Sequence, residues 1–424
     1  MSEWKKVKLG EVAESCLGKM LDAAKNHGEY QPYLANLNVR WGGFDIDNLS
    51  QMRFEEDENE RYGIKYGDLI ICEGGEPGRC AIWKEQLPNM KIQKALHRVR
   101  AKKSILNNFY LFYWFLHAGK LNWLDQYCTG ATIKHLPGQK LKEVVIDMPP
   151  IDIQNRIATI LSRYDSLIEN YQKQIKLLEE TAQRLYKEWF VDLRFLGHEN
   201  AKIVDGVPEG WEKKTIGEIA EINKRNISKD YQYSYLDYTD LGNVRSGRID
   251  IPTRYTYGDE PGRAKRIAQD GDIIWGMVRP NLKSYALVQY PKQQDVFSTG
   301  FAILTAKHVP FSFLYCSVIT DSFVGYLVNC TNGAAYPAVK PEHFSKAQLV
   351  IPTDDIMIMY NELAEPMFRQ VHRILSQVRL LTEARDRLLP KLMSGEISVE
   401  TAQSVTSGLG VRKAQTGSPK PSDS

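Results

Sequence analysis

Hydrophobic residues in two long stretches of the chain recur in steps of four and three, the spacing of an apolar stripe along an α-helix. The first stripe follows Pro149 and Pro150 and consists of Ile153, Ile157, Ile160, Tyr164, Leu167, Tyr171, Ile175, Leu178, Ala182, Leu185 and Trp189. The second consists of Tyr360, Leu363, Met367, Val371, Ile374, Val378, Leu381 and Leu388. The pattern predicts two long helices, and Pro366 is expected to kink or restart the second one because proline lacks a backbone N–H.

The segments before these helices carry short apolar runs bounded by glycine and proline. Gly67-Asp68 and Gly271-Asp272 each predict a turn that leads into a buried strand. Further strands are expected at 144–148 and 348–351, which end at proline. Short buried helices are expected at 109–116 and 311–319.

The two halves of the chain repeat each other. Trp4–Glu14 recurs as Trp211–Glu221, and further matches follow in the same order, at offsets that drift only from 207 to 203 residues. The predicted fold class is therefore α+β, with two repeated α/β modules that are each followed by a long helix. The expected boundaries are module A at 1–150, a helix at 151–196, a connector at 197–210, module B at 211–352, a helix at 353–397 and a disordered tail at 398–424.

The length of the helices favours pairing between them. A continuous helix over residues 153–190 would be roughly 55 to 60 Å long, more than one small module can bury, although a surface helix packed on module A is the alternative. If a two-fold axis relates the repeats, the helices run antiparallel as a coiled coil and act as a ruler. Residues expected to pair the helices or dock a partner are Ile157, Tyr164, Tyr171, Leu178, Leu185, Trp189, Val371, Ile374, Val378, Leu381 and Leu388.

The composition excludes some classes of protein but does not indicate a specific function. The chain has 43% hydrophobic and 25% charged residues, no apolar run as long as a membrane span, and a net charge of only +3. Residues 1–10 lack the apolar stretch of a signal peptide, and six scattered cysteines suit a reducing cytoplasm, where we expect the protein to reside. Basic residues for a nucleic acid would therefore have to be local.

No motif for catalysis emerges from the sequence. Residues 73–78 lack the G-x-G-x-x-G spacing of a dinucleotide loop and indicate a hairpin turn instead. Neither a Walker A sequence nor the Asn-Pro-Pro-aromatic loop of a DNA adenine methyltransferase is present. Asp205, Glu212 and Lys214 mimic a nuclease spacing but straddle the connector, and the histidines are isolated. We expect no catalytic residue, metal ligand or cofactor in this chain.

Local basic residues do indicate nucleic-acid binding. Residues 91–103 hold six lysines or arginines and no acid, and Arg98 and Arg100 would share one face of a strand, suited to phosphates or to a solvated sheet edge. Asn38/Arg40 recurs as Asn243/Arg245, and these side chains pair with adenine and guanine edges, although a simple turn would explain the asparagine. The candidate contacts are Asn38, Arg40, Lys94, Arg98, Arg100, Lys134, His135, Asn243, Arg245, Arg248, Arg279, Lys283, Tyr336 and Lys340.

With these residues in view, the chain resembles the specificity subunit of type I restriction–modification systems over nearly its full length. The resemblance rests on Leu185–Phe195 (LYKEWFVDLRF), on Arg385–Ile397 (RDRLLPKLMSGEI), and on residues 210–221, which open module B as such domains usually open. One departure is Leu196, where the usual ending has a proline.

The resemblance implies a non-catalytic subunit that binds double-stranded DNA. Each module would be a target recognition domain for one half of a bipartite site, and the helices would set the spacer and dock two modification subunits. Those subunits would bind S-adenosylmethionine and methylate adenine, and two restriction subunits would use ATP and Mg²⁺. Open alternatives are a specificity subunit of a methylation-only system, a stand-alone adenine methyltransferase, and a coiled-coil scaffold without a DNA role.

Overall fold

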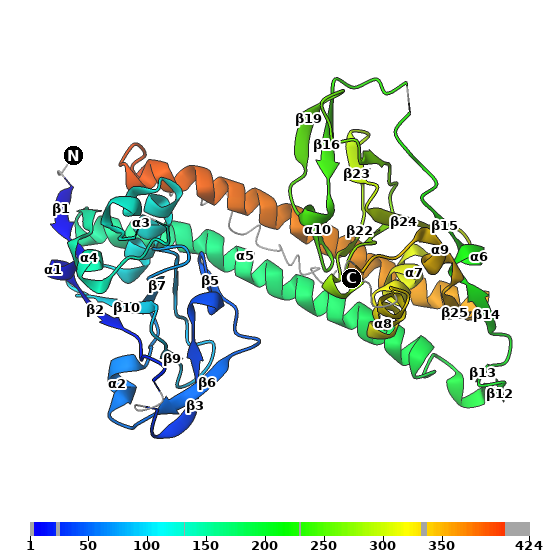
Figure 1. Ribbon diagram of the computed structural model, residues 1–424, viewed down its shortest axis with the longest axis horizontal. Coiled ribbons are helices and arrows are strands. Elements are labelled where there is room, and N and C mark those ends of the chain that lie inside the picture. The colour runs from blue at the N-terminus through cyan, green and yellow to red at the C-terminus, as the bar shows by residue number, and fades with distance from the viewer. Residues whose placement is uncertain (1–3, 23–25, 131, 229, 332–336, 403–424) are drawn as a thin grey trace, which may run out of the picture. The chain divides into compact units, whose positions relative to one another are not determined.

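The computed structural model describes residues 4–22, 26–130, 132–228, 230–331 and 337–402. The chain divides into two compact units. Unit 1 consists of residues 1–169 and 379–424, and unit 2 consists of residues 170–378. Two long helices, α5 (Ile151–Tyr186) and α10 (Asp354–Met393), each contribute one part to either unit (Figure 1).

Module A in unit 1 is built on a four-stranded antiparallel core sheet in the order β2-β10-β7-β8. Its strands are β2 (Ala13–Leu17), β10 (Leu96–Ala101), β7 (Leu69–Cys72) and β8 (Cys80–Ile82). A second, distal sheet has the order β6-β3-β9, with β6 (Ser50–Phe54), β3 (Glu29–Leu34) and β9 (Lys91–Ile92). The remaining elements are β1 (Lys5–Lys8), α1 (Leu9–Val12), β4 (Val39–Arg40), β5 (Gly43–Phe44), α2 (Glu58–Tyr62), α3 (Asn108–Lys120), α4 (Gly138–Glu143) and β11 (Val145–Met148).

Module B in unit 2 repeats this plan. Its core sheet has the order β15-β24-β21-β22, with β15 (Ala220–Ile222), β24 (Phe301–Ala306), β21 (Ile273–Gly276) and β22 (Tyr285–Leu287). Its distal sheet has the order β19-β16-β23-β20, with β19 (Thr253–Thr256), β16 (Tyr235–Thr239), β23 (Asp295–Ser298) and β20 (Ala264–Arg266). The other elements are β14 (Glu212–Thr215), α6 (Ile216–Ile219), β17 (Val244–Arg245), β18 (Arg248–Ile249), α7 (Phe311–Val318), α8 (Asp321–Asn329), α9 (Pro341–Lys346) and β25 (Gln348–Ile351).

The repeated Gly-Asp pairs form the turns that the sequence predicts. Gly67 and Gly271 have φ values of 88° and 85°, which favour glycine. The carboxylates of Asp68 and Asp272 each accept a 2.8 Å hydrogen bond from the backbone N–H three residues earlier. Both aspartates are buried, so the turn fixes the start of β7 and of β21 at the centre of each core sheet.

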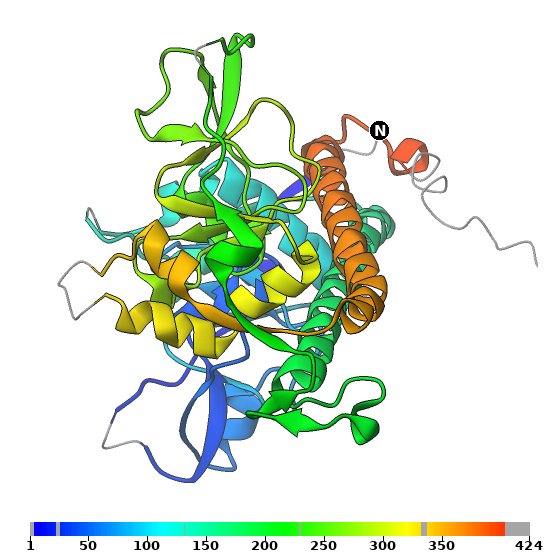
Figure 2. The same cartoon turned by 90° about the vertical axis from the view of Figure 1, so that its right-hand side faces the viewer.

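Within each unit, α5 and α10 lie side by side and run antiparallel (Figure 2). In unit 2, Ile175 packs against Val371 and Ile374, with Tyr171, Leu178 and Val378 around them. In unit 1, Asp165 forms an ion pair with Arg385 at 2.6 Å. Farther along α5 within unit 2, the ring of Tyr186 lies 6.4 Å from that of Tyr360, so residue numbers rise along α5 while they fall along α10. Further stripe residues pack on the module cores, namely Ile157, Tyr164, Leu381 and Leu388 in unit 1, and Leu185 and Trp189 in unit 2. Leu167 and Leu363 are exposed instead.

Two features differ from the sequence prediction: the continuity of the second helix and the point at which the packed chain ends. The second helix does not restart at Pro366, because α10 is continuous from Asp354 to Met393. Pro366 is exposed, where water can satisfy the carbonyl left without its partner. The packed chain also continues beyond Ser398, since Val399 and Ala402 are buried in the core of unit 1. The rest of the expected tail lies outside the described residues.

Candidate nucleic-acid interface

Three loops of module A are joined by hydrogen bonds beside the turn between β7 and β8. They comprise residues 36–42, residues 73–79, which form that turn itself, and residues 129–130 and 132–136. The Nδ2 of Asn36 donates to the carbonyl of Gly74 at 2.6 Å, and Arg79 donates to the Oδ1 of Asn36 at 2.7 Å. His135 forms a β-bridge with Gly74, which brings in the third loop. We name these segments the loop cluster of module A.

The corresponding loops of module B, residues 241–247, 277–284 and 337–340, are joined in the same way. The N–H of Arg279 donates to the carbonyl of Pro337 at 2.8 Å, and Val278 forms a β-bridge with Ala338. The hydroxyl of Ser246 donates to the carbonyl of Lys283 at 3.1 Å. Each unit thus carries one loop cluster beside the same pair of core strands.

Arg40 and Arg245 occupy equivalent positions at the end of the first strand in the β4–β5 and β17–β18 hairpins. Their side chains are 55% and 80% exposed, and each lies beside an aspartate, Asp45 at 3.5 Å and Asp250 at 3.6 Å. At such exposure these ion pairs hold the guanidinium groups only weakly. Both arginines are therefore accessible to a ligand.

The repeated asparagines, by contrast, hold turns. The Oδ1 of Asn38 accepts from the N–H of Ala35 at 2.9 Å, and the Oδ1 of Asn243 accepts from the N–H of Asp240 at 3.0 Å. Asn38 is only 3% exposed. These hydrogen bonds favour a turn-forming role for Asn38 and Asn243 over contact with a base, which stays a prediction.

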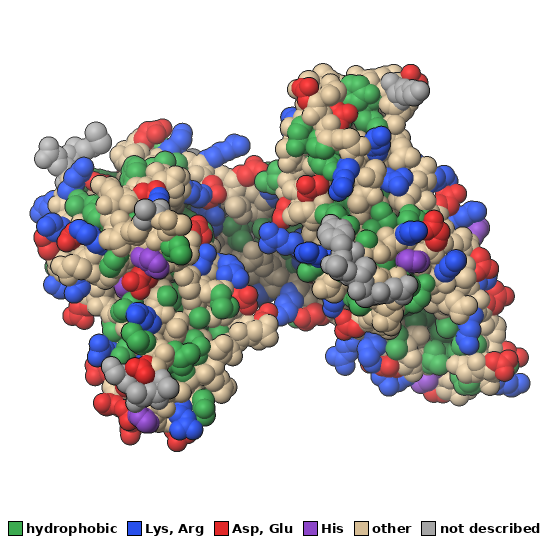
Figure 3. All heavy atoms as spheres, viewed as in Figure 1, with side chains coloured by type: hydrophobic (Ala, Val, Ile, Leu, Met, Phe, Trp, Pro, Cys, Tyr) green, Lys and Arg blue, Asp and Glu red, His purple; other side chains and the backbone are tan. Residues whose placement is uncertain are grey.

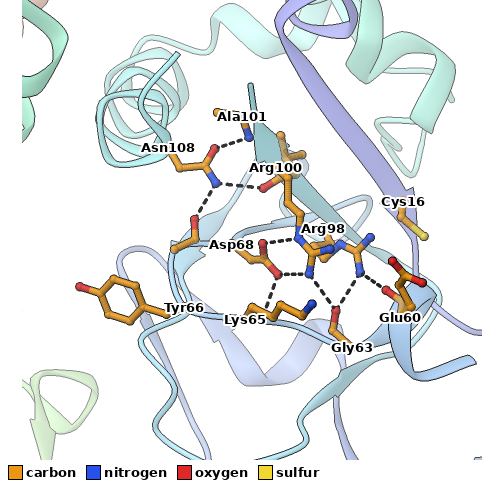
Figure 4. Close-up of polar contacts among 12 residues, drawn as sticks. Cys16, Glu60, Gly63, Lys65, Tyr66, Asp68, Arg98, Arg100, Ala101 and Asn108 are labelled. Carbon is orange, nitrogen blue, oxygen red and sulfur yellow. Dashed lines mark hydrogen bonds and ion pairs between the residues drawn. The ribbon is translucent and has the colours of Figure 1, made fainter. Parts of the chain in front are cut away.

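Arg98 and Arg100 do share one side of β10, as predicted, but their guanidinium groups are used inside unit 1 (Figure 4). Arg98 donates to the carbonyls of Arg61 and Gly63, both at 2.8 Å, which ties the end of α2 to the core sheet. Arg100 donates to both carboxylate oxygens of Asp68, and these hydrogen bonds raise its pKa. These internal partners favour structural roles for both arginines over the phosphate contacts, which stay a prediction.

Arg248 also has an internal partner. Its two terminal nitrogens donate to Glu179 on α5 at 2.5 and 2.8 Å, within unit 2, and this pairing raises the pKa of the guanidinium. The pair fastens the β17–β18 hairpin to the helix. Arg248 is therefore a positioning residue for Arg245 rather than a DNA contact of its own.

The remaining candidates lie in or near the loop clusters. Lys94, His135, Arg279 and Lys340 are exposed. Lys134 and Lys283 are partly exposed, and each forms an ion pair, with Asp125 at 2.6 Å and with Asp321 at 2.7 Å. Tyr336 lies outside the described residues.

Sequence reasoning missed one polar network of the module A loop cluster. Glu76 accepts from the indole of Trp41 at 2.6 Å and from Arg79 at 3.1 Å, and it remains half exposed. Trp41 lies 35 residues before Glu76, so no local pattern indicates that the two side chains meet. The network places an acceptor carboxylate where module B has basic residues.

The described residues offer no group of three or more histidines, cysteines, aspartates or glutamates that could hold a metal ion. On the face seen in Figure 3, lysines and arginines are interspersed with acidic side chains rather than gathered in one patch. No single helix in the described part of the chain is long and apolar enough to cross a membrane, although the bent pair α7 and α8 passes by length and composition alone.

Comparison with known proteins gives one consistent result. The model of the type I restriction modification DNA specificity domain matches residues 1–180. The chain is 27% identical over 360 residues to the type I restriction enzyme MjaIX specificity subunit of Methanocaldococcus jannaschii, covering 79% of this chain and 78% of that protein. It is 21% identical to the MjaVIII specificity subunit of the same organism, with 94% of each chain covered. The chain is thus similar to type I restriction–modification specificity subunits over most of its length.

The solved S subunit of the type-I restriction-modification system from M. genitalium is similar in fold. It has a TM-score of 0.59 at 16% identity and covers 92% of this chain and 96% of its own. The α+β fold class predicted from the sequence is thereby confirmed for this chain.

Proposed function

We propose that this specificity subunit reads a bipartite site on double-stranded DNA, with one half read by each module. Module A would be the first target recognition domain and module B the second. The observation that carries the proposal is the exposed arginine at the same hairpin position of both units, Arg40 and Arg245. A guanidinium in this setting can donate to guanine O6 and N7 or to a phosphate.

The two loop clusters differ in charge, which supports two different half-sites. Module A presents Glu76, whose carboxylate can accept from the amino group of cytosine. Module B presents Arg279 and Lys283, which are donors. A common loop architecture that carries different charged side chains is what two unlike half-sites require.

The helices would dock the modification subunits. Leu177 on α5 and Leu380 on α10 stand at equivalent positions of the repeat, one in each unit, and they are 62% and 60% exposed. Large apolar side chains at matched exposed positions suit two copies of one partner. S-adenosylmethionine would bind on those subunits, and ATP and Mg²⁺ on two restriction subunits, so the chain itself supplies specificity and not catalysis.

The experiment that tests this function is methylation mapping of DNA from cells that express the chain with a modification subunit. We expect one bipartite adenine motif. Arg40→Ala should relax one half of the motif and Arg245→Ala the other, because each residue lies in a separate unit. Arg387→Ala, which removes an 83% exposed arginine from α10, is the charge control and should leave the motif unchanged. Relaxation of both halves by either hairpin variant would contradict modular reading.

Two alternatives are separated by purification. A specificity subunit of a methylation-only system would give the same motif but would assemble without an ATP-dependent subunit. A stand-alone adenine methyltransferase would methylate DNA with S-adenosylmethionine as the purified chain alone, which would overturn the proposed role.

A further inference from the structure

The distal sheets of the two modules carry two tyrosines at matching positions. Tyr30 and Tyr33 of β3 correspond to Tyr235 and Tyr238 of β16, at an offset of 205 residues. The parallel pairing of these strands keeps the same offset, since Tyr33 lies opposite Lys91 and Tyr238 lies opposite Val296. Tyr33 and Tyr238 are buried in the distal lobes, whereas Tyr30 is 60% exposed and Tyr235 is half-buried.

An arginine covers the ring of each outer tyrosine. The Cζ of Arg53 lies 4.9 Å from the ring centroid of Tyr30, and the Cζ of Arg254 lies 4.1 Å from that of Tyr235. The arginines do not occupy the same place in the repeat. Arg53 stands directly opposite Tyr30, whereas Thr256 stands opposite Tyr235 and Arg254 reaches across from two residues away. The two modules thus form the same arginine–tyrosine stack with arginines from different positions of the neighbouring strand.

The contact between the guanidinium and the ring contributes little to the stability of either distal sheet. Met52 and Phe54 in module A, and Leu236 and Tyr238 in module B, are buried on the other side of these strands from the outer tyrosines. Cation–π contacts at exposed sites are weak, so the fold itself does not require them. A recurring feature that the fold does not need indicates a ligand.

The chemistry of the stacked arginines fits DNA. Packing on a ring satisfies the face of a guanidinium and leaves its in-plane N–H groups for acceptors such as phosphate oxygens and guanine edges. Arg254 is further oriented by Asp237, which accepts from it at 2.8 and 2.9 Å, and its side chain is still 61% exposed. The guanidinium of Arg53 has no hydrogen bond or ion pair within the described residues.

We propose that the outer faces of the two distal sheets contact DNA through these stacks, Arg53 with Tyr30 in one half-site and Arg254 with Tyr235 in the other. The proposal rests on the proposed function, because it names a second DNA-contacting surface of each recognition domain. It extends the contact beyond the loop clusters to a separate sheet.

The test is titration of the full chain with a duplex that carries the mapped bipartite motif, at low and moderate salt, and with duplexes in which one half-site is scrambled. Arg53→Ala and Arg254→Ala should each weaken binding roughly ten- to hundredfold and lower the salt dependence by about one phosphate contact. If the arginine reads a base, scrambling its half-site should lower the DNA affinity of the variant by a smaller factor than it lowers the affinity of the unmodified chain. Tyr30→Leu and Tyr235→Leu keep the charge and should weaken binding in part.

The matched control is Arg61→Ala. It removes an exposed arginine from the distal lobe of module A whose Cζ lies 5.2 Å from the ring centroid of Tyr62, on α2 rather than on the sheet. An equal loss from Arg61→Ala, or unchanged affinity and salt dependence for both Arg53→Ala and Arg254→Ala, would overturn the inference. The absence of any bipartite motif for the unmodified chain would instead defeat the proposed function, so the two failures are distinguishable.

Discussion

Arg100 and Asp68 form a two-pronged ion pair at the centre of unit 1, with Nε to Oδ1 at 2.7 Å and a terminal nitrogen to Oδ2 at 2.9 Å. Asp68 is 4% exposed, and the same carboxylate closes the turn before β7. In unit 2 the corresponding Asp272 lies 3.7 Å from Arg225, which comes from a different part of the module. Both modules therefore neutralise the turn aspartate with an arginine, but by different routes.

Replacing Arg100 should destabilise unit 1 without changing what it reads. Arg100→Ala leaves a buried carboxylate without its cation, which should lower the free energy of unfolding by about 2–4 kcal/mol. Denaturant unfolding and DNA titration of the same variant check this. A variant that unfolds normally but binds one half-site less tightly would restore the phosphate role that the sequence suggested.

Acid should destabilise unit 1 through His97. This residue is 1% exposed, its Nε2 lies 3.0 Å from the carbonyl of Leu136, and burial lowers its pKa below the ordinary value of 6.5. The unfolded chain therefore takes up the proton first as the pH falls, so stability is fully present above that value and is lost below it. The loss is at most about 1.4 kcal/mol per pH unit.

The measurement is unfolding free energy between about pH 7.5 and about pH 5.5, the range in which histidine titrates. His97→Gln should flatten this dependence, because glutamine can still donate to the carbonyl but does not titrate. Unit 2 has Ala302 at the corresponding place in its core sheet and provides an internal comparison. An equally steep loss in the His97→Gln variant would show that other groups cause it.

Periodicity and repetition predict much of this architecture from sequence. The long helices, the strands after both Gly-Asp pairs and the duplicated order of modules follow from patterns that local geometry imposes on any chain. The continuity of α10 through Pro366 does not follow from such patterns. The free-energy cost of a proline inside a helix depends on whether the carbonyl left without its partner reaches water. Exposure of that kind is a property of the folded surface.

The candidate site was less predictable, for a physical reason. An arginine in a basic run has the same local sequence whether it faces DNA or a buried aspartate, so Arg98 and Arg100 could not be told from Arg40. The stacks of Arg53 on Tyr30 and of Arg254 on Tyr235 depend on strand pairing between residues about twenty positions apart. Only the offset of the two tyrosines was visible in the sequence.

The ion pair of Arg248 with Glu179 should affect recognition of the second half-site only by positioning the hairpin that carries Arg245. Arg248→Ala removes two charge-assisted hydrogen bonds of a half-buried pair, which should cost about 1–2 kcal/mol and loosen the hairpin that carries Arg245. We expect weaker discrimination at the second half-site and none at the first. The double variant Arg248→Glu with Glu179→Arg restores the ion pair with its charges exchanged and should recover discrimination at the second half-site. Failure of the double variant to recover discrimination would indicate that Arg248 contacts DNA directly.

Matched lengthening of the two helices should widen the unread spacer of the DNA site. One heptad inserted in α5 after Glu169 and one in α10 after Val378 fall where each helix passes from one unit to the other. Each adds about 10.5 Å of helix, which corresponds to about three base-pair steps of 3.4 Å. Antiparallel packing demands that both insertions be made, because after a single one the contacts of Ile175 with Val371 and Ile374 and the ion pair of Asp165 with Arg385 cannot both be kept. We therefore expect the single insertions to disrupt assembly and the double insertion to give a mapped motif with the same half-sites and a longer spacer. An unchanged spacer in an assembled double variant would refute the ruler and assign spacing to the modules themselves.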